Sequence, residues 1–337
     1  MKNETRVLFN QYLDDQAKLN GVPNANVKFN VAPSVQQRLE SRIQESSGFL
    51  KLINIVPVDE KQGEKLGLGT DGPVASRTDT TKNDRATRDV SSIDKHGYSC
   101  EQTNYDTHLR YAKLDMWAKF KDFQLRISRA VQQQCALDRI MIGFNGQQAL
   151  PDTNRDTAPL LQDVNKGWLQ QLREQAAGRV LAGGKTAGKV VVGGGTPDYK
   201  SLDGLVLDAY KSLLDPWHAG AGDLVAIVGR GLMHDKLFPL VDGQKAPTEM
   251  LAASIVVSQM RLGELQAMSV PFFPENKVLI TSLDNLSIYY QEGARRRSVI
   301  DNPKRDQIET YESSNDAFVV EDFGKACLVE NIEIVAS

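Results

Sequence analysis

The sequence predicts an α+β protein, because segments typical of helices and of strands are intermixed along the chain and no internal repeat is present. Apolar residues recur at helical spacing in four stretches, and a fifth helix is expected to begin at Asp198. The four stretches are 4–20, one that begins at Ser34, 114–143 and 163–176. Short apolar runs typical of strands lie at 224–229, 277–282, 286–290, 317–320 and 327–335.

The first helix is expected to end at Asn20-Gly21, a common C-terminal stop signal. A polar linker follows, and Ser34 with Gln37 in capping-box position predicts the start of a second helix. We therefore expect residues 1–30 to form a helix on a tether.

Residues 57–97 are unusually polar. Only eight of these 41 residues are hydrophobic, too few to bury a core of their own. Two interpretations remain open: a disordered linker, or an extended β-hairpin that finds its partner surface on another chain.

The strongest helical pattern covers residues 114–143 and ends at Gly143. Its length predicts a helix on which other elements pack. The predicted apolar stripe consists of Trp117, Phe120, Phe123, Ile127, Ala130, Gln134, Leu137 and Met141.

Composition argues against several classes of protein. The chain has 337 residues, 41% of them hydrophobic and 25% charged, which is ordinary for a globular protein. Its formal charge of −3 disfavours a dedicated nucleic-acid-binding protein, and the basic cluster at 295–297 is interpreted as a solvated turn. No run reaches the length of a membrane span, and the N-terminus lacks a secretory signal, so we expect no membrane contact and folding in the cytoplasm.

Cysteine usage indicates neither a zinc ribbon nor a disulfide framework. Cys100, Cys135 and Cys327 are odd in number, widely spaced, and include no CxxC pair. We expect three buried, unreactive thiols.

Two glycine-rich segments resemble nucleotide-binding motifs but fail on spacing. In GRVLAGGKTAGK, the position five residues before Gly184 is Arg179, where a phosphate loop needs glycine. In IVGRGLMHDK, Gly229 and Gly231 fit a dinucleotide motif, but His234 occupies the third glycine position. The four histidines lack metal-ligand spacing, and no serine or cysteine has the sequence context of a nucleophile. The sequence therefore predicts no catalytic residue, no metal and no cofactor.

Several long blocks resemble the major capsid proteins of P2-type tailed bacteriophages, the Peduovirus group. The resemblance covers nearly the whole chain. Its blocks are KNETRVLFNQYL near the start, QESSGFLKLINIVPV at 44–58, KLDMWAKFKDFQLRI at 113–127, LDRIMIGFNG at 137–146, LLQDVNKGWLQ at 160–170, LVAIVGRGLMHDKLFP at 224–239, LITSLDNLSIYY at 279–290 and DNPKRDQIETYESSNDAFVVEDF at 301–323.

This resemblance implies the HK97-type capsid fold. Its parts would be an N-terminal arm (1–56), an extended β-hairpin loop (57–97), a peripheral domain (98–197) with a spine helix at 114–143, an axial domain (198–292), and a return to the peripheral domain (293–337). The implied function is structural rather than enzymatic: hexamers and pentamers of this chain would form an icosahedral procapsid and then the DNA-containing head.

The resemblance also implies partners and processing. The partners would be a phage scaffold-protease, a portal protein at one vertex, and packaged double-stranded DNA in weak non-specific contact. Assembly would take place in the bacterial cytoplasm, and the product would reside in the virion. Residues 1–29 would be a removable assembly segment, and alignment on VAPS places the cut between Phe29 and Asn30.

Two alternatives are kept open. The first is a nanocompartment shell protein of the same fold, which would enclose a cargo enzyme and need no removable arm. The second is a nucleotide-dependent enzyme that uses the GGKT segment around Lys185.

Overall fold

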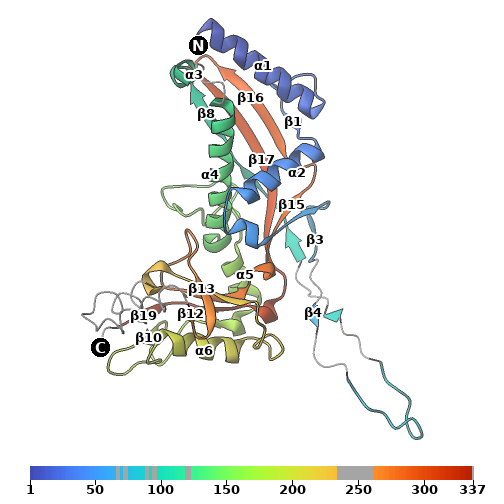
Figure 1. Cartoon of the computed structure of the whole chain (residues 1–337), viewed down its shortest axis with the longest axis vertical. Helices are drawn as coiled ribbons and strands as arrows, with labels where there is room; N and C mark the ends of the chain where they lie inside the picture. The colour runs from blue at the N-terminus through green and yellow to red at the C-terminus, as the bar shows by residue number, and fades with distance from the viewer. Residues whose placement is uncertain are drawn as a thin grey trace, which may run out of the picture.

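The computed structural model describes residues 1–65, 69–70, 75–87, 91–92, 97–117, 123–233 and 261–335. These ranges form an elongated upper lobe around one sheet and a lower lobe around a second sheet (Figure 1). Helices and strands are intermixed in both lobes, so the predicted α+β class is confirmed. Among the described helices, none combines the length and the hydropathy that a membrane span requires.

The upper lobe is organised by its longest strand, β17 (Gln307–Val320). β17 pairs antiparallel with four other strands, and two more strands extend the sheet at its edges. The sheet thus joins segments from the first and last thirds of the sequence. Its other strands are β1 (Phe29–Asn30), β2 (Asn54–Val58), β7 (Glu101–Asn104), β8 (Thr107–Arg110), β15 (Leu286–Gln291) and β16 (Arg296–Asn302).

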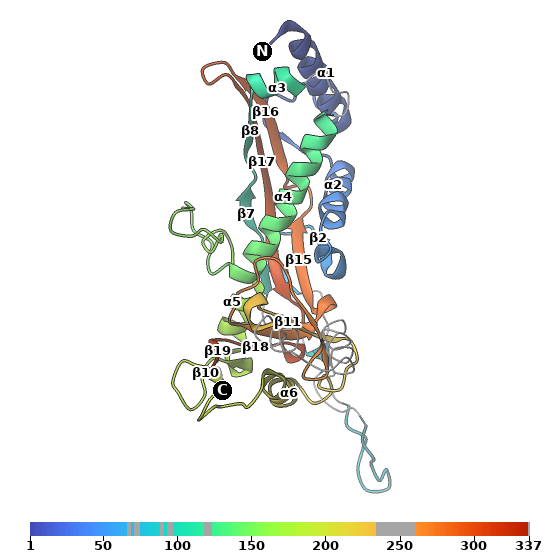
Figure 2. The same cartoon turned by 60° about the vertical axis from the view of Figure 1, so that its left-hand side comes forward.

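Two helices occupy the range predicted for the long helix: α3 (Tyr111–Trp117) and α4 (Phe123–Asn145), with residues 118–122 outside the described part. α4 runs along the upper sheet (Figure 2). The predicted apolar stripe is wrong in the middle of α4, where Ala130 and Gln134 are exposed. The buried face carries Arg139, whose paired charge interrupts the apolar pattern. The other buried residues on this face include Gln132, Cys135, Ala136 and Ile140.

The two N-terminal helices are α1 (Asn3–Asn20) and α2 (Pro33–Glu45). α1 ends as predicted, because Gly21 adopts a left-handed conformation (φ 65°) that only glycine reaches without strain. The predicted capping box at Ser34 is wrong. Pro33 begins α2 one residue earlier, since its fixed φ suits the first helical turn and its missing amide is not needed there.

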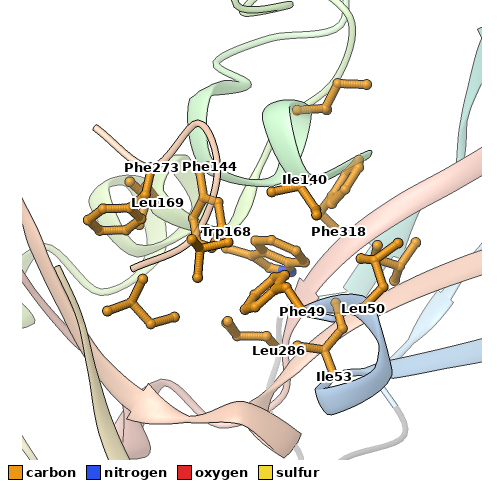
Figure 3. Close-up of a cluster of buried hydrophobic side chains, with 14 of the residues drawn as sticks. Phe49, Leu50, Ile53, Ile140, Phe144, Trp168, Leu169, Phe273, Leu286 and Phe318 are labelled. Carbon is orange, nitrogen blue, oxygen red and sulfur yellow. The ribbon is translucent and has the colours of Figure 1, made fainter. Parts of the chain in front are cut away.

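The main hydrophobic core surrounds Trp168 at the junction of the two lobes (Figure 3). Its indole ring lies edge-on to Phe144 and Phe318, at centroid distances of 5.2 and 5.4 Å, and its Nε1 donates to the carbonyl of Ser287 at 3.0 Å. Trp168 opens α5 (Trp168–Gln175), which is shorter than the predicted 163–176 because the preceding residues form a turn.

The lower lobe is built on a six-stranded sheet in the described part of the chain. β11 (Leu224–Val228) and β14 (Val278–Ser282) are buried at every residue, as their continuous apolar runs predict. α6 (Leu202–Leu213) packs on this sheet and begins four residues after the predicted start, capped by Ser201. The remaining strands are β9 (Val180–Leu181), β12 (Arg261–Leu262), β13 (Leu265–Met268) and β18 (Cys327–Val329).

Short elements complete these lobes. β10 (Val190–Val192) and β19 (Ile332–Ile334) form a parallel pair beside the lower sheet. The 3-10 turns are η1 (Leu50–Leu52), η2 (Ala177–Arg179), η3 (Leu283–Asn285) and η4 (Phe323–Lys325).

The residues that belong to each of the two sheets do not follow the domain boundaries expected from the sequence. β15 falls within the range expected for the axial domain, but it pairs with β17 and β2 of the upper sheet. β18 falls within the expected return to the peripheral domain, but it pairs with β14 of the lower sheet. The chain therefore crosses between the lobes more often than the sequence boundaries imply.

Within the polar segment at 57–97, the described residues project from the upper lobe as a hairpin (Figure 1). β3 (Gln62–Glu64) pairs antiparallel with β6 (Gly97–Ser99), and β4 (Gly69–Thr70) with β5 (Ser91–Ser92). The described residues 75–87 are almost all exposed. This geometry corresponds to the extended-hairpin interpretation.

Gly143→Ala should destabilise the protein, because a Cβ at this position of α4 would overlap the ring of Trp168. Overpacking of a core costs about 1–3 kcal/mol, and a rigid indole leaves little room to relax. Urea unfolding of the purified chain should show this loss. Gly178→Ala is the control, because a Cβ there meets open space, and an equal effect of the two substitutions would contradict the packing argument.

Candidate functional site

The segment that resembles a phosphate loop is closed around Asp198. The amides of Lys185 and Val191 donate to its two carboxylate oxygens at 2.7 and 2.8 Å. The Lys185 ammonium donates to the carbonyl of Pro197 at 3.0 Å. The amides and the amine that would face a phosphate are thus already bound within the chain, which removes the structural basis of the nucleotide hypothesis.

The second glycine motif is explained by packing. Gly229 follows β11, and a side chain there would overlap the backbone of Glu275. The glycine therefore permits a close approach of two backbone segments. His234, at the third position of this motif, lies outside the described residues.

The histidines do not form a metal centre in the part of the chain that the structure describes. His108 is exposed on β8, and the Nε2 of His218 lies 3.0 Å from Asp322. His96 and His234 fall outside the described ranges. Within those ranges, no three His, Cys, Asp or Glu side chains are grouped so that they could hold a metal ion.

Cys100, Cys135 and Cys327 are buried free thiols. Burial raises the pKa of each to about 12, so each stays protonated near neutral pH. The prediction of buried, unreactive thiols is confirmed.

α1 packs against the upper lobe, which corrects the expectation of a helix on a free tether. Phe9, Tyr12 and Leu13 lie against a small apolar cluster that includes Val299 and Ile308. α1 thus covers part of β16 and β17 within its own chain (Figure 2).

Charged groups also hold α1. Arg6 forms an ion pair with Asp301, and the hydroxyl of Tyr111 donates to the same carboxylate. The backbone amide of Lys2 donates to Asp115 of α3 at 2.8 Å. Three large apolar side chains of α1 remain exposed: Val7, Leu8 and Leu19.

The predicted cleavage site falls inside β1. Phe29 pairs with Arg297 and Asn30 with Arg296, so this peptide bond forms part of the outer edge of the upper sheet. Phe29 is buried in a cluster with Val31, whereas Asn30 is exposed. The idea of a bare, accessible linker is therefore wrong, because backbone pairing and one buried ring order this segment.

Five buried charges form what we call the ion-pair network: Glu40, Arg139, Arg295, Glu312 and Asp316. Arg139 pairs with Glu40 at 2.5 Å and with Asp316 at 3.1 Å. Arg295 pairs with Glu40 at 2.6 Å and with Glu312 at 2.5 Å. The network connects α2, α4, β17 and the turn before β16.

Arginine contacts keep the network carboxylates charged. Burial disfavours the charged form of Glu40, but Arg139 and Arg295 outweigh this effect and lower its pKa. Burial acts in the same way on Glu312, and Arg295 followed by Arg297 lowers its pKa. Ionised carboxylates in this location bind α2 to the rest of the upper lobe.

The base of the hairpin is attached to β15 of the upper sheet and to η4, the turn between β17 and β18. The ring of Tyr98 in β6 lies edge-on to Tyr289 of β15, at a centroid distance of 5.1 Å. The amide of Cys100 donates to the carbonyl of Lys61 at 2.8 Å and closes the base. The ammonium of Lys65 lies 3.8 Å from the ring centroid of Phe323, in the range of a cation–π interaction.

The ion-pair network was not predicted from the sequence. The prediction of a solvated turn at 295–297 is wrong for Arg295, which is almost fully buried, and for Arg297, which is half-buried. One signal was present: Gln36 and Glu40 share helical spacing with Ile43 on the buried face of α2. That spacing did not reveal the partners, which lie far away in the sequence.

Comparisons with known proteins find relatives that match this chain over nearly its whole length. The family model for phage major capsid proteins of the P2 family matches residues 8–332. The chain is 47% identical over 342 residues to a capsid protein of Escherichia phage P2, covering 99% of this chain and 96% of that protein. It is 41% identical over 341 residues to the major capsid protein of Serratia phage KSP20, covering 98% and 97%.

Solved structures of capsid chains are also similar to this chain. A chain in the procapsid of satellite phage P4, solved with the size determination protein Sid, superposes with a TM-score of 0.83 at 45% identity and covers 99% of both chains. A capsid chain of an empty GTA particle superposes with a TM-score of 0.53 at 14% identity, covering 86% of this chain and 90% of that chain. The second likeness concerns the fold alone.

Arg139→Met should destabilise the chain by about 3–5 kcal/mol, because it leaves two buried carboxylates short of a partner. Lys166→Met is the matched control. It removes a cation of similar length from a surface pair with Glu174, which is worth roughly 0–1 kcal/mol. Denaturant unfolding compares the two, and similar losses would show that the network contributes no more than a surface pair.

Proposed function

Because this chain belongs to the P2 family of phage major capsid proteins and has the HK97-type capsid fold, we propose that it closes an icosahedral head from hexamers and pentamers of itself. The upper lobe would serve as the peripheral domain and the lower lobe as the axial domain. Residues 1–56 would serve as the arm, and the hairpin as the extended loop. A nanocompartment shell is not favoured, since the matched phage proteins are covered almost end to end.

The observation that carries this proposal is the end-to-end match to a procapsid subunit, 99% of both chains at a TM-score of 0.83. The hairpin adds physical support. It projects from the body with short paired strands and almost entirely exposed described residues between 75 and 87. Such an element gains stability when it lies on another subunit, and closed symmetry multiplies each contact of this kind.

The partners proposed for this shell are a scaffold-protease, a portal protein at one vertex, and the packaged double-stranded DNA. We propose that assembly takes place in the bacterial cytoplasm and that the mature protein resides in the virion. The formal charge of −3 suits weak, non-specific contact with DNA, because tight phosphate binding needs a basic excess. The exposed apolar side chains of α1, Val7, Leu8 and Leu19, offer the scaffold contacts of limited size.

We propose that the protease cuts between Phe29 and Asn30 and removes α1. β1 has only two residues and lies at the edge of the sheet, so little pairing must break before it can enter a protease as an extended strand. Val31 and α2 remain attached to the body on the other side of the cut, through the bond from the Val31 amide to the Arg295 carbonyl and through the ion-pair network.

Co-expression of the full chain with its scaffold-protease should give closed shells in electron micrographs and a chain that begins at Asn30 by intact mass. Co-expression with the protease inactivated is the control and should give shells of the uncut chain. A stable monomer under both conditions would contradict the shell function, and shells without a shortened chain would contradict the cleavage.

Deletion of residues 1–29 before assembly should leave a folded subunit that assembles poorly or aberrantly. The ion-pair network and the Trp168 core lie outside the deleted segment, but the deletion uncovers Val299 and the edge of β16. Circular dichroism would test folding, and electron microscopy would test shell size against the full chain. Normal shells of uniform size would refute this role of the segment.

A further inference from the structure

Arg297 connects the removable helix to the ion-pair network. Its guanidinium donates to the hydroxyl of Tyr12 at 3.1 Å and to the side chain of Gln16 at 3.4 Å, both on α1. Its Nε faces inward and lies 3.8 Å from Oε2 of Glu312. One side chain thus contacts both a segment that would be lost and a charge cluster that would remain.

The inward contact of Arg297 is incomplete. Its Nε is buried and has no hydrogen-bond partner, which is costly for a charged donor. Arg295 approaches the other oxygen of Glu312, Oε1, through Nε at 2.7 Å and through its terminal nitrogen at 2.5 Å. A distance of 3.8 Å from Nε to Oε2 is too long for a hydrogen bond.

The negative charges within the network outnumber the positive charges, so another cation could pair with it. Three carboxylates, those of Glu40, Glu312 and Asp316, face only two buried guanidinium groups. Arg297 lies two residues after Arg295 and on the same side of the strand, and its charge already contributes to the lowered pKa of Glu312. A shift of the Arg297 guanidinium of about 1 Å would complete the pairing.

We propose that Arg297 registers the presence of α1: the helix holds its guanidinium away from Glu312, and removal of residues 1–29 lets it close on that carboxylate. This role rests on the cleavage proposed above. After cleavage, Tyr12 and Gln16 are gone, and Glu312 is the anion already nearest to the freed group. The new ammonium at Asn30 would lie beside β16 and adds no competing acceptor.

Closure of Arg297 on Glu312 would offset part of the stability that the subunit loses when residues 1–29 are removed. Before the cut, β16 is held partly by α1 and β1. After the cut, the same strand would be bound more tightly to β17 and, through Arg295 and Glu40, to α2. The lost arm contacts are thereby partly replaced by a charge-assisted hydrogen bond.

The direct test compares wild-type shells with inactive and active protease by electron cryomicroscopy that resolves side chains. We expect the separation of Arg297 Nε and Glu312 Oε2 to fall from 3.8 Å to about 3 Å in cut shells. A shortened chain with an unchanged separation, or with Arg297 turned to solvent, would overturn this role of Arg297 and leave the cleavage standing. A chain of unchanged mass would overturn both.

Substitution gives an independent energetic test. Arg297→Met should accelerate the unfolding of cut shells by about tenfold and of uncut shells by about threefold or less. Arg296→Met, on the exposed neighbour in β16, is the control and should affect both kinds of shell alike. Arg297→Lys should restore part of the loss in cut shells. Equal effects of Arg297→Met before and after the cut would contradict the proposal.

Discussion

The pairing of Arg139 with Glu40 and Asp316 is the constraint on which the upper lobe depends. Buried charges are tolerated only when their partners are in place, so α4, α2 and β17 must meet at one point. Arg295 extends the same requirement to the chain that enters β16. The aromatic core around Trp168 buries apolar side chains without directional bonds between them. The buried ion pairs, in contrast, require their partners at defined distances, which restricts how α2, α4 and β17 can be arranged.

The contrast between the apolar core and the buried charges explains which parts of the fold the sequence could predict. Continuous apolar runs identified β11 and β14, since burial on both faces leaves no polar positions, and Gly21 marked the end of α1. The buried face of α4 was assigned wrongly because its deepest position is an arginine. Periodicity records which residues avoid water, but it does not record a polar residue whose partners lie 99 and 177 positions away.

The functional surfaces were more difficult to predict from the sequence than the fold, because no catalytic pattern marks them. Full-length resemblance predicted the fold and the shell function, and the comparisons agree. The resemblance did not predict how the arm is held. α1 occupies an apolar surface and a sheet edge of its own chain, and the bond proposed for cleavage is ordered within β1. Cleavage would therefore be coupled to the unpairing of an edge strand, and its rate would depend on local opening as well as on sequence.

The hairpin base has a mechanical consequence. In the described part of the chain, its root includes a short strand pair, an aromatic contact from Tyr98 to β15 and a cation–π contact from Lys65 to η4. A hairpin held at its root acts as a lever, so a small rotation there becomes a large displacement at the far end. In the proposed shell of pentamers and hexamers, five-fold and six-fold positions would differ in curvature. The angular compliance of this root would then contribute to the range of curvature that a single subunit accommodates.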